Sequence, residues 1–283
     1  MKVSYYPGCS LHGTAVEYEE STQAVCQMLG IELNELPDWN CCGASSAHSI
    51  YEDLAIALPA RNLAIAEEVG LDLVVPCAAC FQRFKVAEKH IREGKEPTVD
   101  TPYQGKVPIK HLLDFLCEEE VLKVIQKKVK RPLAGLKAVC YYGCLTVRPP
   151  KVTDAANCEN PQAMDDLITL LGAESYPWSY KTDCCGGSLM LSRTDIVVRL
   201  TGKLLHMAEE AGANCMVTAC PLCQANLDTR QAEASKALGK DFHLPIFYFT
   251  ELLGLAMGCG EVGHWAKRHI VDPSDLLREH NLM

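Results

Sequence analysis

The sequence predicts an α/β protein of two tandem homologous domains, each a small parallel sheet flanked by helices. Three observations support this prediction. Segments with the residue pattern of strands alternate with segments that have the apolar spacing of helices. A five-cysteine pattern occurs twice along the chain. Each cysteine group stands after a predicted strand and before a predicted helix, at the edge where open α/β folds bind ligands.

The predicted strands and helices alternate in the same order in both halves. In the first half we expect strands at 2–6, 31–36 and 71–75, and helices at 15–30, 51–70 and from about residue 78. In the second half we expect strands at 136–142, near 174–180 and at 214–218, and helices at 162–171, 187–211 and from 221. Strands that alternate with helices in this way favour a parallel sheet.

The repeated cysteines form two sets, each with a single Cys, a Cys-Cys-Gly and a Cys-x-x-Cys. The first set is Cys9, Cys41, Cys42, Cys77 and Cys80, and the second set is Cys144, Cys184, Cys185, Cys220 and Cys223. In both sets 34 residues separate the Cys pair from the Cys-x-x-Cys motif. Self-similarity on this scale indicates duplicated domains.

The segments around the cysteines repeat as well. YYPGC (5–9) matches YYGC (141–144), and VPIKHLLDFL (107–116) matches LPIFYFTELL (244–253). We therefore expect an N-terminal domain at 1–130 and a C-terminal domain at 131–283. The boundary falls in the stretch 118–132, whose mixed charges are typical of an exposed helix and linker.

Composition narrows the class of protein. The chain has 283 residues, of which 48% are apolar, so it can bury a sizeable core. A net charge of −9 argues against a nucleic-acid surface and an anionic membrane surface. The N-terminal segment shows no secretory pattern, and the longest apolar run, 247–258, is too short for a membrane span. We expect a soluble, cytoplasmic protein.

The ends of parallel strands meet at one sheet edge, so we expect the first set to converge in one site and the second set in another. The helices that follow point their N-termini to this edge, and helix N-termini favour negative charge such as thiolates. Gly43, Gly186 and Gly187, which follow the Cys pairs, let the backbone turn sharply and approach a ligand.

Sixteen cysteines in such a chain indicate metal or redox chemistry. Structural zinc takes four ligands, so a fifth thiolate would be surplus, and adjacent cysteines aim poorly at one small ion. Disulfides are rare in the cytosol, and a redox Cys-x-x-Cys would leave three repeated cysteines in each half unexplained. An iron–sulfur cluster presents several irons, which adjacent thiolates can share. Iron–sulfur is therefore favoured, with zinc and disulfides kept as alternatives.

The remaining cysteines have no counterpart when the halves are overlaid. They are Cys26, Cys117, Cys140, Cys158, Cys215 and Cys259. Free cysteine is commonly a small buried hydrophobic residue, and we expect that role for them. Cys140 is the member of this group nearest to a repeated cysteine, because it stands four residues before Cys144.

The doubled C…CCG…CxxC pattern resembles the CCG-domain proteins, and the chain as a whole resembles the B-type subunit of heterodisulfide reductase. The segment CYYGCLTVRPP (140–150) is particularly similar to that type. The resemblance implies two non-cubane [4Fe-4S] clusters, one bound by the five cysteines of each set. It also implies a ferredoxin-like iron–sulfur subunit of the C type as electron donor, fed by a flavin subunit of the A type.

In that family the clusters reduce the mixed disulfide of coenzymes M and B. The segments YYPGCSLHGT and CCGASS look more like bacterial members, many of which do not use those coenzymes. We therefore predict a catalytic subunit that reduces this disulfide or a bacterial equivalent, with one electron from each cluster. The alternatives are an electron-transfer module of a larger flavin-based bifurcating or oxidase complex, without its own substrate, and a zinc-stapled scaffold.

Basic side chains near the cysteines could bind an acidic substrate tail. The candidates are Arg83, Arg148, Lys181 and Arg193. His12 and His48 lie near the first set in the sequence and could donate protons. Exposed surface charges and loop histidines are the ordinary roles of such residues.

Overall fold

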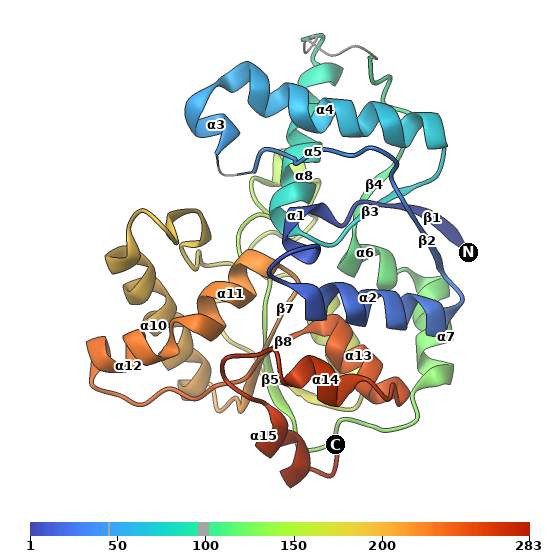
Figure 1. Ribbon diagram of the computed structural model, residues 1–283. Helices are drawn as coiled ribbons and strands as arrows, with labels where there is room; N and C mark the ends of the chain where they lie inside the picture. Colours follow the sequence, from blue (N-terminus) through green and yellow to red (C-terminus); the bar gives the residue numbers. More distant parts are fainter. Residues whose placement is uncertain (45, 96–101) are drawn as a thin grey trace.

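The computed structural model describes residues 1–44, 46–95 and 102–283 (Figure 1). These residues form two four-stranded sheets, with strand orders β2-β1-β3-β4 and β6-β5-β7-β8, and every strand pair is parallel. Both sheets therefore have the same topology. The predicted α/β class with two parallel-sheet units is confirmed.

The first sheet and its helices occupy the first half of the chain. Its elements are β1 (Lys2–Tyr5), α1 (Gly8–Leu11), α2 (Val16–Leu29), β2 (Glu32–Glu35), α3 (Ala47–Ile50), α4 (Glu52–Val69), β3 (Leu73–Val75), α5 (Ala78–Arg92), β4 (Ile109–His111), α6 (Leu112–Leu116) and α7 (Glu119–Lys128). Helix α7 lies in the predicted exposed stretch, and it buries Val121 and Ile125 while its charged residues face outward.

The second half repeats the arrangement and adds two C-terminal helices. Its elements are β5 (Lys137–Tyr141), α8 (Pro150–Thr153), α9 (Ala163–Leu170), β6 (Glu174–Ser175), the 3₁₀ turn η1 (Gly187–Leu189), α10 (Thr194–Glu210), β7 (Cys215–Thr218), α11 (Pro221–Thr229), α12 (Gln231–Leu238), β8 (Ile246–Tyr248), α13 (Phe249–Met257), α14 (Val262–Ala266) and α15 (Ser274–Glu279). The last strand of the first sheet ends at His111, and the first strand of the second sheet begins at Lys137. The predicted domain boundary at 130/131 falls between these strands and stays a prediction.

Two predicted elements are shorter than expected. The strand near 174–180 ends at Ser175. Tyr176 makes the last ladder bond, and the next acceptor along β5, the carbonyl of Cys140, is taken by the indole hydrogen of Trp178. The helix 187–211 begins only at Thr194. Gly186 and Gly187 favour a turn over a helix, so the segment before Thr194 forms η1 and a loop.

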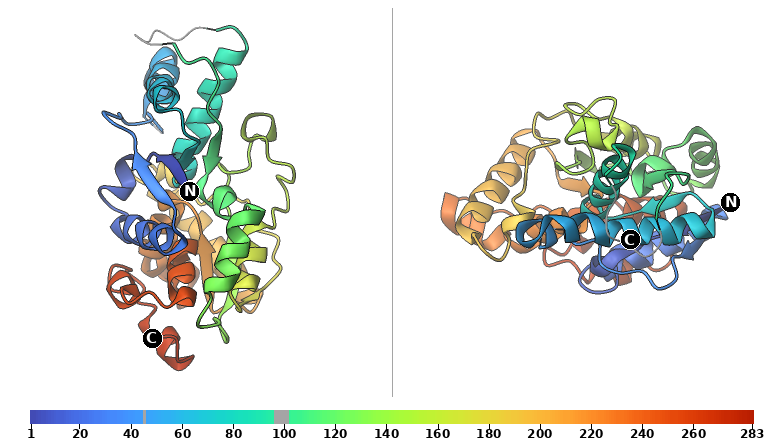
Figure 2. Two further views of the ribbon diagram at one scale, coloured as in Figure 1. Left: turned by 90° about the vertical axis from the view of Figure 1, so that its right-hand side faces the viewer. Right: turned by 90° about the horizontal axis from the view of Figure 1, so that it is seen from above.

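The two halves pack against each other through α2 and α13, which lie side by side near the middle of the molecule (Figures 1 and 2). The ring of Tyr18 stacks on that of Tyr248 with centroids 4.1 Å apart. The hydroxyls of Ser21 and Thr250 form a buried hydrogen bond of 2.7 Å. One apolar core runs through both halves, so the carboxyl edges of the two sheets are held in a fixed relation.

Helix α4 lies at one end of the molecule and α15 at the other (Figures 1 and 2). Among the helices of the described residues, none combines the length and the apolar character that a membrane crossing requires.

Candidate metal centre

The first cysteine set gathers at the carboxyl edge of the first sheet. Cys9 follows β1, the Cys41–Cys42 pair follows β2, and Cys77 and Cys80 stand at the start of α5 after β3. The Sγ atoms of Cys42 and Cys80 are 3.1 Å apart. The thiols of Cys9 and Cys41, of Cys41 and Cys42, and of Cys77 and Cys80 also lie close enough to shift each other's pKa. The five thiols therefore form one continuous group.

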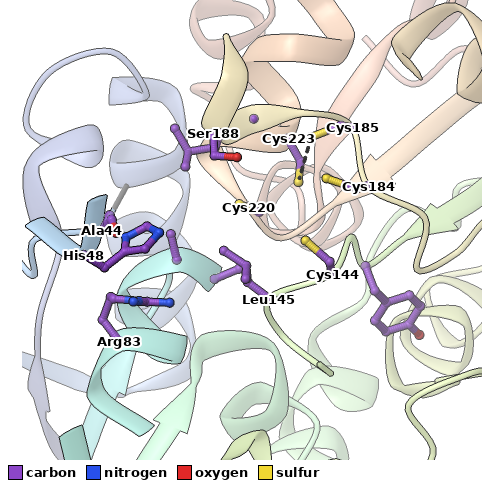
Figure 3. Close-up of a pocket in the computed structure, with 15 residues that line it drawn as sticks. Ala44, His48, Arg83, Cys144, Leu145, Cys184, Cys185, Ser188, Cys220 and Cys223 are labelled. Atoms are coloured by element: carbon purple, nitrogen blue, oxygen red, sulfur yellow. Dashed lines mark hydrogen bonds between the residues drawn. The ribbon is translucent and has the colours of Figure 1, made fainter. Parts of the chain in front are cut away.

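The second set repeats this arrangement on the second sheet. Cys144 follows β5, and Cys220 and Cys223 stand at the start of α11. The Sγ atoms of Cys185 and Cys223 are 3.6 Å apart (Figure 3). The thiols of Cys144 and Cys184, and of Cys220 and Cys223, lie close enough to shift each other's pKa. The structure thus brings together the cysteines of each set, as the topology predicts.

The two sets also meet each other, which the sequence did not predict. The thiols of Cys77 and Cys220 lie close enough across the interface between the halves to shift each other's pKa. The hydroxyl of Tyr18, on α2, reaches the carbonyl oxygens of Pro76 (3.2 Å) and Ala219 (3.4 Å), the residues directly before these cysteines. The packing of α2 between the halves therefore fixes the point where the sets touch.

A tyrosine in each half supports the loop that carries the Cys pair. The Tyr6 hydroxyl donates to the carbonyl of Asn40 (2.9 Å), and the Tyr141 hydroxyl donates to the carbonyl of Asp183 (2.6 Å). Each of these carbonyls directly precedes a Cys pair. The repeated YYPGC and YYGC segments carried this signal, but the sequence reasoning did not recognise the role of the tyrosines.

The glycines after the Cys pairs turn the backbone as predicted at two of three positions. Gly43 and Gly186 have positive φ angles of +78° and +83°, which side chains with a Cβ rarely adopt. Their amides lie 3.5 Å and 3.3 Å from the Sγ atoms of Cys41 and Cys184. Gly187 instead begins η1. The turns aim backbone donors at the sulfur that precedes them.

In both sets the lone cysteine and the first member of the Cys pair shift each other's pKa in the same sense. A hydrogen bond from Cys144 lowers the pKa of Cys184 to about 6. Hydrogen bonds from Cys42 and Cys9 lower the pKa of Cys41. The hydrogen-bonded partners Cys9 and Cys144 have raised pKa values. The exposed first member of each Cys pair therefore ionises more readily than an ordinary cysteine, and the thiolate is the form that binds metal.

The donor set fits a polynuclear centre better than a single ion. In the parts of the chain that the structure covers, no group of three or more His, Cys, Asp or Glu side chains is placed to hold one metal ion. The sulfur atoms instead form chains of neighbours, and all the repeated donors are soft thiols, which select iron–sulfur clusters. The residues present therefore fit an iron–sulfur group.

A cavity of about 170 Å³ opens beside the second set (Figure 3). All five cysteines of the second set line it. The cysteines of the first set do not, although all five are among the described residues. The first half instead contributes Ala44, His48, Ala78, Ala79 and Arg83. The cavity therefore lies between the halves and exposes the thiols of one set only.

Among the candidate basic residues, only Arg83 lines this cavity. Arg148 pairs with Glu159 at 2.8 Å, and Arg193 pairs with Asp195 at 2.7 Å. These two arginines are engaged elsewhere on the surface.

Lys181 is buried and pairs with Asp165 at 2.9 Å, away from the cavity. Its backbone carbonyl accepts the amides of Tyr142 and Gly143, directly before Cys144. It therefore supports the second set from behind rather than facing a ligand.

The two candidate histidines also differ in their position relative to the cavity. His48 lines the cavity, with Nδ1 at 2.8 Å from the carbonyl of Ala44. His12 lies outside it, against Trp39 and Glu35.

The unrepeated cysteines take no part in this arrangement. Cys26, Cys140 and Cys215 are buried, as expected of small hydrophobic residues, whereas Cys117, Cys158 and Cys259 are only partly buried. Cys140 points to Ser175 (3.8 Å), and its carbonyl accepts the indole hydrogen of Trp178. Its proximity to Cys144 in the sequence therefore does not place its thiol with the second set.

Comparison with known proteins now gives the family. The model of the cysteine-rich CCG domain matches residues 3–85 and 138–228, one match in each half. The chain belongs to the CCG cysteine-rich domain family. The two CCG domains contain all ten repeated cysteines, and each covers the first three strands of a sheet.

Several CCG-domain relatives align over nearly the whole chain. The 8-methylmenaquinol:fumarate reductase membrane anchor subunit of Wolinella succinogenes is 30% identical over 280 residues, covering 96% of this chain and 98% of that relative. The B-type subunit of the ferredoxin:CoB-CoM heterodisulfide reductase of Methanosarcina mazei is 27% identical over 269 residues, covering 91% and 89%. The predicted similarity to the B-type subunit of heterodisulfide reductase is confirmed.

A solved structure supports the CCG fold independently. A hypothetical protein from Helicobacter pylori superimposes with a TM-score of 0.75 at 12% identity. The match covers 96% of this chain but only 52% of that chain, so this protein spans about half of it. At this identity the likeness shows the fold alone.

Proposed function

We propose that this chain is the iron–sulfur catalytic subunit of a heterodisulfide reductase-type complex and reduces a small disulfide, CoM-S-S-CoB or a bacterial equivalent. The observation that carries the proposal is the cavity lined by all five thiols of the second set. Relatives named as the B-type subunit of heterodisulfide reductase align with more than nine-tenths of the chain. An enclosed site beside redox-active sulfur ligands is where a small acceptor would react.

In this proposal each set binds one [4Fe-4S] cluster of the non-cubane type. Cys9, Cys41, Cys42, Cys77 and Cys80 would hold the first cluster, and Cys144, Cys184, Cys185, Cys220 and Cys223 the second. Five thiols in a set exceed the four that an ordinary cluster takes, and this surplus supports the unusual type. When bound, the clusters supply the two electrons that a disulfide requires.

The protein's own residues would position the acceptor and manage charge. The reaction is R–S–S–R′ + 2 e⁻ + 2 H⁺ → RSH + R′SH, so one S–S bond breaks and two S–H bonds form. The N-termini of α5 and α11 point partial positive charge at the sulfur-rich edge. His48 lies at the cavity with Nδ1 bound to a carbonyl, which leaves Nε2 able to exchange protons.

The electrons would come from partner subunits. The chain lacks a ferredoxin-type C-x-x-C-x-x-C run, so it has no separate relay cluster of that kind. We propose a ferredoxin-like iron–sulfur subunit of the C type as the direct donor and a flavin subunit of the A type behind it. The exposed thiols of Cys9 and Cys41 mark the side of the first set that is open to such a donor.

A second function is favoured by a different observation. The relative from Wolinella succinogenes is named as the membrane anchor subunit of a menaquinol:fumarate reductase, and it aligns over the whole chain. The contact between Cys77 and Cys220 would also suit an electron-transfer module that passes electrons between two centres without a substrate of its own. The polar wall that faces the thiols, with His48 and Arg83, is the feature that such a module would not need.

The deciding experiment uses protein purified without oxygen. Iron and acid-labile sulfide should each approach about eight per chain, as two four-iron clusters require. The reduced protein should then convert small disulfides to thiols. Zinc near two per chain without iron would reject the clusters. Full cluster content with no thiol from any disulfide would favour the electron-transfer module.

A further inference from the structure

Arg83 brings a positive charge into the cavity beside the second set. It lies on α5, three residues after Cys80, and it lines the cavity together with Cys144 and Cys184 (Figure 3). The side chain is half-buried. Because an arginine keeps its charge in proteins, the cavity is cationic on the side that faces the thiols.

No carboxylate of the residues described neutralises this guanidinium. The Nε of Arg83 donates to the side-chain oxygen of Gln82 (2.8 Å), a neutral amide. By contrast, Arg148 and Arg193, which lie outside the cavity, both pair with carboxylates. The acidic group that acts on Arg83 is the thiol of Cys42, in its own half. A partly buried charge without a carboxylate partner is stabilised by an anionic ligand. The terminal nitrogens of Arg83 are thus left as donors for such a ligand.

The second half has no cation at the matching position. Asn226 stands three residues after Cys223, as Arg83 does after Cys80. Asn226 is buried, and its amide donates to the carbonyl of Cys185 (3.2 Å), within its own set. The duplicated scaffold therefore accepts a neutral residue here. The first half instead directs an arginine across the interface toward the thiols of the other half.

The helices at the cavity add to this charge. Helix α5 starts at Ala78 and α11 starts at Pro221, and Ala78, Ala79 and Leu222 line the cavity. The first turn of a helix carries partial positive charge and unpaired amides. Two such ends and one guanidinium therefore surround the same space.

We propose that Arg83 binds the anionic end of the electron acceptor and makes the cavity selective for small disulfides that carry a carboxylate, sulfonate or phosphate group. This inference rests on the proposed function, because it names the acceptor class of the same cavity. All three anions offer paired oxygens that accept two parallel hydrogen bonds from a guanidinium. Leu145, between Arg83 and Cys144 in Figure 3, provides an apolar contact for the middle of the molecule.

The cluster that the five thiols are proposed to hold would take up part of this cavity of about 170 Å³. The remaining space beside Arg83 would therefore receive only the end of an acceptor molecule. Arg83 acts on binding rather than on electron transfer, so its loss should change KM more than kcat.

The test compares charged and neutral disulfides with the cluster-containing protein and reduced methyl viologen as donor. The probes are 3,3′-dithiodipropionate, the disulfide of 2-mercaptoethanesulfonate, and the neutral bis(2-hydroxyethyl) disulfide. Arg83→Gln should raise KM for both anionic probes roughly 10- to 100-fold, as expected for a lost charge-assisted hydrogen bond. The KM of the neutral probe and all kcat values should change less than twofold.

Two further variants sharpen the result. Arg83→Lys should give an intermediate KM, because an ammonium keeps the charge but loses the planar fork. Arg193→Gln is the matched control, since it removes an exposed arginine outside the cavity, and it should leave every KM unchanged. Iron content is measured for each variant, so that a folding or cluster defect is recognised.

Titration calorimetry separates binding from turnover. The ligand is the thioether analogue of dithiodipropionate, which cannot be reduced, with inorganic phosphate as a competitor to test the third anion. The Kd of the thioether should rise in Arg83→Gln by the same factor as the KM of the anionic disulfides. Equal KM values for charged and neutral probes, or unchanged values in Arg83→Gln, would overturn the role of Arg83 while disulfide reduction stands.

Failure of the wild-type protein to reduce any probe would reject the proposed function instead. Calorimetry then still decides on Arg83. Binding of the anionic thioether to the wild type, with weaker binding to Arg83→Gln, supports an anion site. The absence of binding to both proteins overturns it.

Discussion

The loops that carry the two Cys pairs are held by different kinds of contact, although their backbones repeat. In the first half, Arg61 pairs with Asp38 on the surface, three residues before Cys41. In the second half, the matching position is Lys181, which is buried with Asp165.

The difference between the two loops corresponds to their position relative to the cavity. The second set lines it, and its loop is fixed from behind by a buried ion pair that solvent screens little. The first set lies outside the cavity, where Cys9 and Cys41 are exposed. The ion pair that supports its loop, Arg61 with Asp38, lies on the protein surface. The duplication thus supplies one scaffold with two different surroundings. In the proposed function, the second half would be the acceptor side and the first half the side open to a donor.

The largest expected effect comes from removing a buried thiol from either set. Cys42→Ser and Cys185→Ser should each lose about half of the iron and sulfide, because each removes a ligand from one proposed four-iron cluster. Disulfide turnover should fall at least tenfold in both variants, since two electrons are needed. Metal analysis and the disulfide assay measure these changes.

The same variants should differ in binding. Only Cys185→Ser alters the cavity lining, so it should weaken binding of an anionic thioether while Cys42→Ser leaves it nearly unchanged. Cys140→Ser is the control, because Cys140 is buried but outside both sets, and it should keep all its iron. Full turnover in either single-set variant would contradict the two-centre proposal.

The next effect tests the ion pairs behind the loops. Lys181→Met should lower the free energy of unfolding by about 3 kcal/mol, because it leaves a buried carboxylate without its cation. Arg61→Met should cost no more than about 1 kcal/mol, since that pair is exposed to solvent. Urea unfolding of the metal-free chain measures both. Equal losses in the two variants would remove the distinction between the loops.

A pH-dependent contact belongs to the second half. Burial lowers the pKa of His269, but the adjacent Glu251 carboxylate outweighs burial, and the pKa rises to about 9. A histidine whose pKa is raised on folding stabilises the native state below its unfolded pKa of about 6.5, and this stability is lost as pH rises through 9. The melting temperature should therefore fall between about pH 6.5 and pH 9.

Glu251→Gln is the matching variant, because it removes the partner of His269 and keeps the size of the side chain. It should melt at a lower temperature than the wild type at pH 6 and show a smaller decrease toward pH 9. An unchanged slope would show that His269 is not responsible.

The cysteine spacing was sufficient to predict both sheets and the gathering of each set. Each group follows a strand, and parallel strands end at one edge, so Cys9, Cys42 and Cys80 had to approach one another. The early end of β6 could not be predicted, because it depends on the side chain of Trp178, which donates to the Cys140 carbonyl that the next ladder amide would bind.

The contact between the sets could not be predicted in this way. It depends on how α2 packs on α13, and apolar helix faces do not specify their partner. The role of Arg83 was hidden for the same reason. In the sequence it is equivalent to Arg148 and Arg193, and only the interface between the halves shows which arginine faces thiols.

The smallest expected effect concerns the tyrosines that support the Cys pairs. Tyr141→Phe removes a buried hydrogen bond of 2.6 Å to the Asp183 carbonyl, and Tyr6→Phe removes one of 2.9 Å to the Asn40 carbonyl. Each change should cost about 1 kcal/mol of unfolding free energy, because the carbonyl loses its donor while the ring still packs. If the second loop is the stiffer support of the cavity, Tyr141→Phe should also raise KM for an anionic disulfide severalfold, whereas Tyr6→Phe should not. Equal KM changes in both variants would mean that the loops support the cavity equally and that the asymmetry lies in the ion pairs alone.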